Sequence, residues 1–160
     1  NSVLHEVYGY TESFNPKTFW EEISDLGPDY IIIRDMCLSE NVFDQETPTE
    51  DLSKFYENAT PHQRLLAENF EKIQGSISEK HSNFLHFLLK YQYTENWDRE
   101  VQENYVPFDY ESLIGDLPEN YDVCFVSHYG LPFLRGRVKE DFDLELVECT
   151  HVKIILKRKS

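Results

Sequence analysis

The feature that most constrains the fold is an uninterrupted apolar run, Tyr-Ile-Ile-Ile, at residues 30–33. Three β-branched residues in succession favour a strand, and a run without any polar position is typical of a strand covered on both faces in an open α/β sheet. The run ends abruptly at Arg34 and Asp35. Similar runs at residues 123–126 and 152–156 predict two further strands.

Helical patterns occupy much of the sequence between these strands. Asn15 is a suitable N-cap for a helix that begins at Pro16 and ends before Gly27. Residues 37–60 are acidic and contain Pro48, which indicates a loop. The other helices are predicted at residues 62–74, 78–91 and 97–105, and a short one follows a cap at Asp109.

The order of these elements predicts the closing part of an open α/β sheet. The segment between the last two strands shows no helical pattern, so we expect these strands to form an antiparallel hairpin. The first strand would then be a parallel one, and residues 37–106 would form a loop and helical insertion. Residues 1–160 would be a single domain or a domain fragment. A further structural element would have to cover the other side of the first strand.

The composition excludes several classes of function. Lys and Arg number 15 against 30 Asp and Glu, for a formal net charge of −15, which argues against nucleic acid and anionic membranes as partners. Apolar residues at 40% are too many for a disordered acidic tail, and no run reaches the roughly 20 residues of a membrane span. Cys37, Cys124 and Cys149 form no CxxC pair or disulfide framework, so we expect a reducing, cytoplasmic location.

Candidate site residues follow from the strand ends, because ligands bind beyond the carboxyl ends of parallel strands in open α/β sheets. This rule selects Arg34 and Asp35 after the first strand. It also selects Ser127, His128 and Tyr129 after the second, if the two strands run in the same direction. Alternatively, Arg34 and Asp35 form a structural ion pair, and His128 only makes hydrogen bonds within the fold at the end of its strand.

Two further groups of residues carry titratable side chains. His5 and Glu6 form a pair in an otherwise apolar segment and could provide a general base, or could lie exposed on a helix. Glu100, Glu103 and Asn104 have spacings that share one helix face and could line a pocket for a cationic or hydroxylated ligand. The alternative is that the aromatic residues there, such as Tyr105, only anchor the helix. No metal site is predicted.

The opening residues resemble a known family. Residues 1–6, Asn-Ser-Val-Leu-His-Glu, resemble the segment after the fourth strand of class I S-adenosylmethionine-dependent methyltransferases. In that family a helix, a Gly-Pro turn and a fifth strand ending in an acidic residue follow, which resembles residues 19–35 here. The family closes with a hairpin of its sixth and seventh strands. Its glycine-rich cofactor loop and acidic ribose-binding residue would precede Asn1.

The resemblance implies the carboxyl-terminal part of a Rossmann-like methyltransferase, whose cofactor half is absent or supplied by another chain. The activity would be transfer of a methyl group from S-adenosylmethionine to a small-molecule acceptor held near the insertion at residues 37–106. By the same resemblance, Asn1 and Ser2 would lie beside the cofactor and His5 and Glu6 would face the acceptor. The other implied site residues are Arg34 and Asp35 on the pocket floor, His128, Tyr129, Glu100 and Tyr105 on the acceptor side, and His151 as a weaker candidate.

Two other classes of function stay open. One is a non-catalytic, methyltransferase-like binding or assembly module, and the other is an RNA methyltransferase whose basic surface lies elsewhere. The apolar strand at residues 30–33 would have an unpaired edge, so we expect this chain to be oligomeric or bound to a missing half and to bind S-adenosylmethionine negligibly by itself. The basic clusters here are Arg135, Arg137 and Lys139, and then Lys153, Lys157, Arg158 and Lys159.

Overall fold

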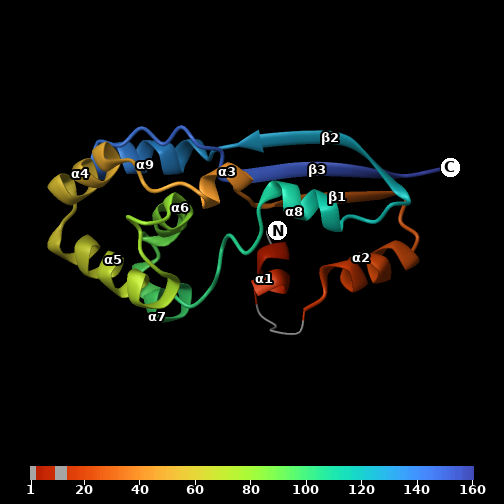
Figure 1. Ribbon diagram of the computed structural model, residues 1–160, viewed down its shortest axis with the longest axis horizontal. Helices are drawn as coiled ribbons and strands as arrows, with labels where there is room; N and C mark the ends of the chain where they lie inside the picture. The colour runs from red at the N-terminus through yellow and green to blue at the C-terminus, as the bar shows by residue number, and fades with distance from the viewer. Residues whose placement is uncertain (1–2, 10–13) are drawn as a thin grey trace.

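The computed structural model describes residues 3–9 and 14–160. Its sheet has three strands, β1 (Tyr30–Met36), β2 (Tyr121–Tyr129) and β3 (His151–Arg158), in the order β1-β3-β2 (Figure 1). Both outer strands pair antiparallel with β3. The predicted α/β class and the antiparallel pairing of the last two strands are therefore confirmed.

β1 and β2 point in the same direction, because each is antiparallel to the strand between them. They are not neighbours, so the described strands contain no parallel ladder and the Rossmann-like part of the prediction is not confirmed. Met36 at the end of β1 and Tyr129 at the end of β2 both pair with His151 at the start of β3. The carboxyl ends of β1 and β2 therefore meet at one end of the sheet.

Three helices lie along one face of this sheet: α1 (Leu4–Gly9), α2 (Pro16–Asp25) and α8 (Tyr110–Asp116) (Figure 1). Both predicted caps are confirmed, since Asn15 accepts hydrogen bonds from the backbone of Lys17 and Thr18, and Asp109 accepts one from Ser112. The core between the sheet and these helices includes Trp20, Ile33, Leu113, Val152, Ile154 and Leu156.

The remaining helices gather at one end of the sheet, where we call them the helical lobe (Figure 1). Phe55 lies at its centre and makes edge-on contacts with Phe84, Phe87 and Phe142. The longest helix, α5, has 14 residues, and no helix in the described chain is long and apolar enough to cross a membrane. The lobe contains α3 (Glu40–Phe43), α4 (Thr49–Asn58), α5 (Pro61–Gln74), α6 (His81–Lys90), the 3-10 turn η1 (Thr94–Asn96), α7 (Trp97–Glu100) and α9 (Pro132–Phe142).

The prediction of a loop over residues 37–60 is wrong, because α3 and α4 lie within it. Leu52, Phe55 and Ala59 follow helical spacing and pack into the lobe. Two of the acidic residues that suggested a loop, Glu50 and Asp51, lie in the first turn of α4. Negative side chains are favourable at that end of a helix dipole.

The expected hairpin loop between the last two strands is also corrected, because α9 lies within it. Leu134, Val138 and Phe142 are spaced by four residues and all are buried against the lobe. The charged residues between them obscured this apolar stripe. A third correction concerns the helix expected at residues 97–105, since α7 ends at Glu100 and the following residues form turns.

The first strand is not covered on both faces as predicted. Ile33 is 5% exposed, whereas Ile32 is 72% exposed on the face opposite the three helices. The register places Ile32, Ile155 and Phe125 in one row across that face, where Phe125 is 47% exposed. We call this side of the sheet the open face, because none of the described helices packs on it (Figure 1).

Candidate functional site

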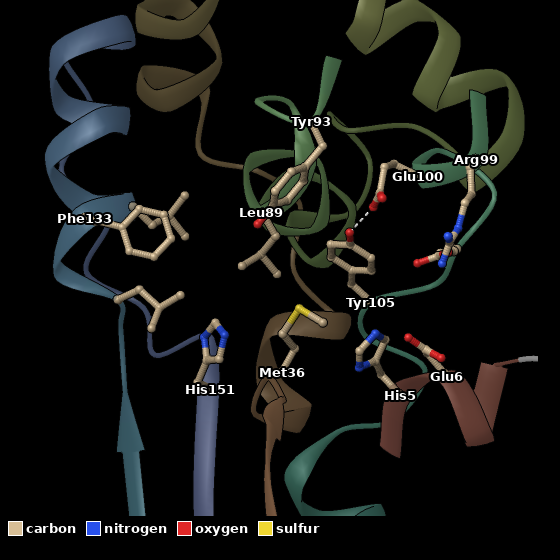
Figure 2. Close-up of a pocket in the computed structure, with 13 residues that line it drawn as sticks. His5, Glu6, Met36, Leu89, Tyr93, Arg99, Glu100, Tyr105, Phe133 and His151 are labelled. Atoms are coloured by element: carbon tan, nitrogen blue, oxygen red, sulfur yellow. Dashed lines mark hydrogen bonds and ion pairs between the residues drawn. The ribbon is translucent and has the colours of Figure 1, made fainter. Parts of the chain in front are cut away.

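A cavity of about 350 Å³ opens where the carboxyl end of β1 meets the helical lobe (Figure 2). This volume falls within the roughly 300–1,000 Å³ typical of small-molecule sites. Its walls come from α1, α6, α7 and α9, the ends of β1 and β3, and the turns after α7. Its charged and titratable lining residues are His5, Glu6, Tyr93, Arg99, Glu100, Glu103, Tyr105 and His151.

His5 and Asp35 form a buried pair beside this cavity. His5 Nδ1 lies 2.8 Å from Asp35 Oδ1, and His5 is only 5% exposed. Asp35 also accepts backbone hydrogen bonds from Leu4 at 2.7 Å, from His5 at 3.2 Å and from Met36 at 2.7 Å. The start of α1 is thus fastened to the end of β1 by one carboxylate.

This arrangement sets the orientation and the tautomer of the His5 ring. The Asp35 carboxylate accepts three backbone N–H groups and, being ionised, can only accept hydrogen bonds. The ring atom that contacts it, His5 Nδ1, must therefore donate, so Nδ1 carries the proton. Nε2 is then the basic nitrogen of the neutral ring. Within the described residues Nε2 has no hydrogen-bond partner. The one side-chain polar atom there that is both fully buried and without a partner is Nδ1 of His81, so His5 Nε2 is not fully buried. His5 Nε2 is therefore accessible from the cavity, whose wall the ring forms in Figure 2.

Glu100 and Tyr105 form the wall next to His5 (Figure 2). The Tyr105 hydroxyl donates a short hydrogen bond to Glu100 Oε2. Burial and this carboxylate raise the pKa of Tyr105 above its usual range, so the phenol stays protonated. Tyr105 also contacts His5 edge-on, with 5.5 Å between ring centroids. One hydrogen bond therefore fixes a carboxylate and a phenol on the same side of the cavity as His5.

Lys90 supports this wall from behind. It is fully buried, and its ammonium group donates to the backbone carbonyls of Glu100 at 2.7 Å and Glu103 at 2.5 Å. The same group lies 4.3 Å from the centroid of the Tyr105 ring. Burial lowers the pKa of Lys90 to about 7, against opposing effects of Glu100 and Glu103. The position of the turn after α7 thus depends on an amino group buried inside the core.

His151 lines the cavity from the start of β3 (Figure 2). Its Nδ1 lies 2.9 Å from the Thr150 hydroxyl. Burial lowers the pKa of His151 to about 4, so its ring is neutral at neutral pH. It contributes a polar but uncharged surface to the cavity.

The structure brings together several of the residues selected from the sequence. His5, Glu6, Glu100, Tyr105 and His151 all line the cavity. Asp35 lies directly behind His5. Their segments are far apart in the sequence, and they meet because α1, α7 and β3 converge on the carboxyl end of β1.

Other selected residues lie elsewhere. Arg34 and Tyr129 point to the open face, where Arg34 Nε donates to the Tyr129 hydroxyl at 3.0 Å. His128 contacts Tyr110 of α8 edge-on, with centroids 4.5 Å apart, and does not line the cavity. Asn1 and Ser2, expected beside the cofactor, lie outside the described residues.

The contacts of the basic and metal-ligating side chains are as follows. Arg137 and Lys139 of α9 form ion pairs with Glu140 and Asp143, so part of the basic surface needed for nucleic acid is neutralised. Over residues 3–9 and 14–160, no cluster of three His, Cys, Asp or Glu side chains could hold a metal ion.

Sequence reasoning missed Lys90 and the apolar wall of the cavity, formed by Met36, Leu89 and Phe133. Lys90 stands at the end of the apolar helix α6, and a lysine there normally points to water. One signal was present, since Lys90 follows Leu88 and Leu89 on a helix that is buried on nearly all sides. A helix without a polar face leaves its lysine no exposed position.

Comparisons with protein-family models, with curated proteins and with solved structures found no match for this chain.

Proposed function

We propose that this chain carries the acceptor site of an S-adenosylmethionine-dependent methyltransferase that acts on a small molecule. One observation carries the proposal: a buried His5–Asp35 pair presents Nε2 to a cavity of ligand size. The common direction of β1 and β2 supports it as well, since their carboxyl ends meet at this cavity. The resemblance of residues 1–6 and 19–35 supplies the reaction class.

The role of the chain in this reaction is to bind the acceptor and remove a proton from it. An O–H or N–H group of the acceptor donates its proton to His5 Nε2, and the bonding electron pair stays on the acceptor atom, which becomes the nucleophile. Asp35 holds Nδ1–H and stabilises the imidazolium that forms. Such a base typically contributes about 10²- to 10⁴-fold in rate.

The lining residues fit an acceptor but not the whole cofactor. They provide carboxylates, imidazoles, a phenol and apolar side chains, whereas the sequence contains no glycine-rich loop to approach the adenosine end. The two residues expected beside the methionine end, Asn1 and Ser2, lie outside the described part of the chain.

The test uses the natural protein at its natural length. We expect calorimetry to detect S-adenosylmethionine binding and methyl transfer to fall about 10²-fold or more in His5→Gln. His62→Gln, an exposed histidine on α5, is the matched control and should keep full activity. Absence of cofactor binding at millimolar concentration would contradict the methyltransferase proposal.

A second candidate function is that of a binding or assembly module, and the open face favours it. Its row of Ile32, Ile155 and Phe125 is flanked by Lys153 and Lys157, whereas the chain as a whole has a net charge of −15. An acidic surface of a second copy would complement this face. Light scattering should then show association that increases with protein concentration, weakens with salt and is lost in Ile32→Lys. A monomer at every concentration would contradict this candidate.

A further inference from the structure

The cavity has two chemically different sides, and this division determines which acceptor it can hold. In Figure 2, Phe133 and Leu89 lie on one side, and Glu100, Arg99 and Glu6 lie on the other. Leu131 and Leu134 extend the apolar side. A ligand that fills the cavity must therefore have an apolar body and a polar end.

The charges on the polar side favour a cation at that end. Arg99 Nε is engaged with Glu103 Oε1 at 2.8 Å, so these two lining charges compensate each other. Glu100 is oriented by Tyr105, which occupies one of its carboxylate oxygens. The Glu6 carboxylate makes no hydrogen bond within the described residues. Among the lining residues, Glu6 and Glu100 are thus carboxylates without an ion-pair partner, and this excess of acidic lining disfavours a carboxylate or phosphate on the ligand.

His5 provides an independent indication of a ligand that carries a proton to be removed. Its ring is more than nine-tenths buried, and Nε2 faces the cavity without a partner among the described residues. Tyr93 and Tyr105 add aromatic surface between the two sides, which also suits a cation. The acidic side chains and the unpartnered imidazole nitrogen lie on the same side of the cavity (Figure 2).

We infer that the acceptor is an amine with an apolar body, bound as its ammonium ion between Glu6 and Glu100. This inference rests on the proposed function. The ammonium ion has no free electron pair and cannot react as a nucleophile. One N–H bond breaks, the proton moves to His5 Nε2, and the electron pair stays on the nitrogen of the neutral amine. The carboxylates select the cation, and His5 then deprotonates it.

The test compares three probes of nearly equal size: phenethylamine, 2-phenylethanol and phenylacetate. Calorimetry or NMR titration of the chain should show binding of phenethylamine, with affinity for the alcohol lower by about tenfold or more and no binding of the carboxylate. Glu6→Gln and Glu100→Gln should each weaken amine binding several-fold, and should leave the affinity for the alcohol unchanged. Glu57→Gln, an exposed residue of α4, is the control and should bind like the wild type.

Folding is checked by the thermal midpoint of each variant, and the side-chain amide introduced by Glu100→Gln can still accept from the Tyr105 hydroxyl. Equal or tighter binding of the alcohol, or amine binding that is insensitive to both substitutions, would overturn the inference. The outcome is separable from that of the proposed function. Amine binding without methyl transfer would contradict the proposed methyltransferase and support an amine as the ligand. Methyl transfer to an alcohol would support the methyltransferase and contradict the amine.

Discussion

Arg34 and Asp35 are neighbours in β1, but they face opposite sides of the sheet and differ in almost every respect. Asp35 is fully buried under α1 and accepts hydrogen bonds from three backbone groups and the His5 ring. Arg34 is exposed on the open face and donates to the Tyr129 hydroxyl. The alternation of the strand therefore separates two residues that the sequence had placed in one site. Of these two neighbours, only Asp35 lies beside the cavity, behind His5.

The largest difference between the two faces should appear when these neighbours are replaced. Asp35→Ala leaves three backbone donors and a buried imidazole without an acceptor, and we expect a loss of about 3–5 kcal/mol in the free energy of unfolding. Arg34→Ala should cost less than about 1 kcal/mol, because its contact is exposed. Urea denaturation of both variants measures the difference. Similar losses for the two variants would show that the faces are not as different as described.

The second pair uses the same residue type at adjacent positions. Ile33 is buried in the core, whereas Ile32 is exposed. Ile33→Ala should lower the free energy of unfolding by about 2–4 kcal/mol, since it removes buried methyl groups and leaves a cavity. Ile32→Ala should change it by less than about 0.5 kcal/mol at protein concentrations where the chain is monomeric. A large effect of Ile32→Ala under those conditions would indicate that a surface within the chain covers the open face.

A smaller effect concerns two lysines, Lys90 in the lobe and Lys153 on the open face. Burial lowers the pKa of Lys90 to about 7, so the unfolded chain binds more protons than the native chain above that pH. Its contribution to stability therefore rises with pH between about 7 and 9, by roughly 2 kcal/mol. Subtracting the stability curve of Lys90→Met from that of the wild type isolates this rise.

Lys153→Met is the control for this measurement, because Lys153 is exposed and lies over the Tyr129 ring. Its stability curve should run parallel to that of the wild type between about pH 7 and 9. If Lys90→Met also ran parallel to the wild type, Lys90 would titrate like an ordinary surface lysine, and the lowering of its pKa by burial would be wrong.

Local signals predicted those parts of the fold that depend on neighbouring residues. Asn15 and Asp109 cap their helices as expected, because a cap depends on the residues that directly follow it. The three strands lie where the apolar runs are. The helix α9 was missed because burial of Leu134, Val138 and Phe142 depends on the lobe, and charged residues hide this stripe in the sequence.

The site could be predicted only as separate fragments. His5 and Asp35 were both selected, but their contact joins residues 30 positions apart and depends on how α1 packs over the end of β1. Glu100 and His151 come from still other segments. The role of Lys90 depends on the absence of any exposed face on α6, which only the packed lobe determines.

The central claim is that Asp35 holds the His5 ring so that Nε2 faces the cavity as a base. Nitrogen-15 NMR of histidine-labelled protein tests this directly, because the two ring nitrogens have different shifts when protonated. We predict that neutral His5 carries its proton on Nδ1, that phenethylamine perturbs the Nε2 signal, and that His62 is unaffected by the amine. The account would be contradicted by a proton on Nε2 of neutral His5. It would also be contradicted by an Nε2 shift that stays unchanged when the amine binds.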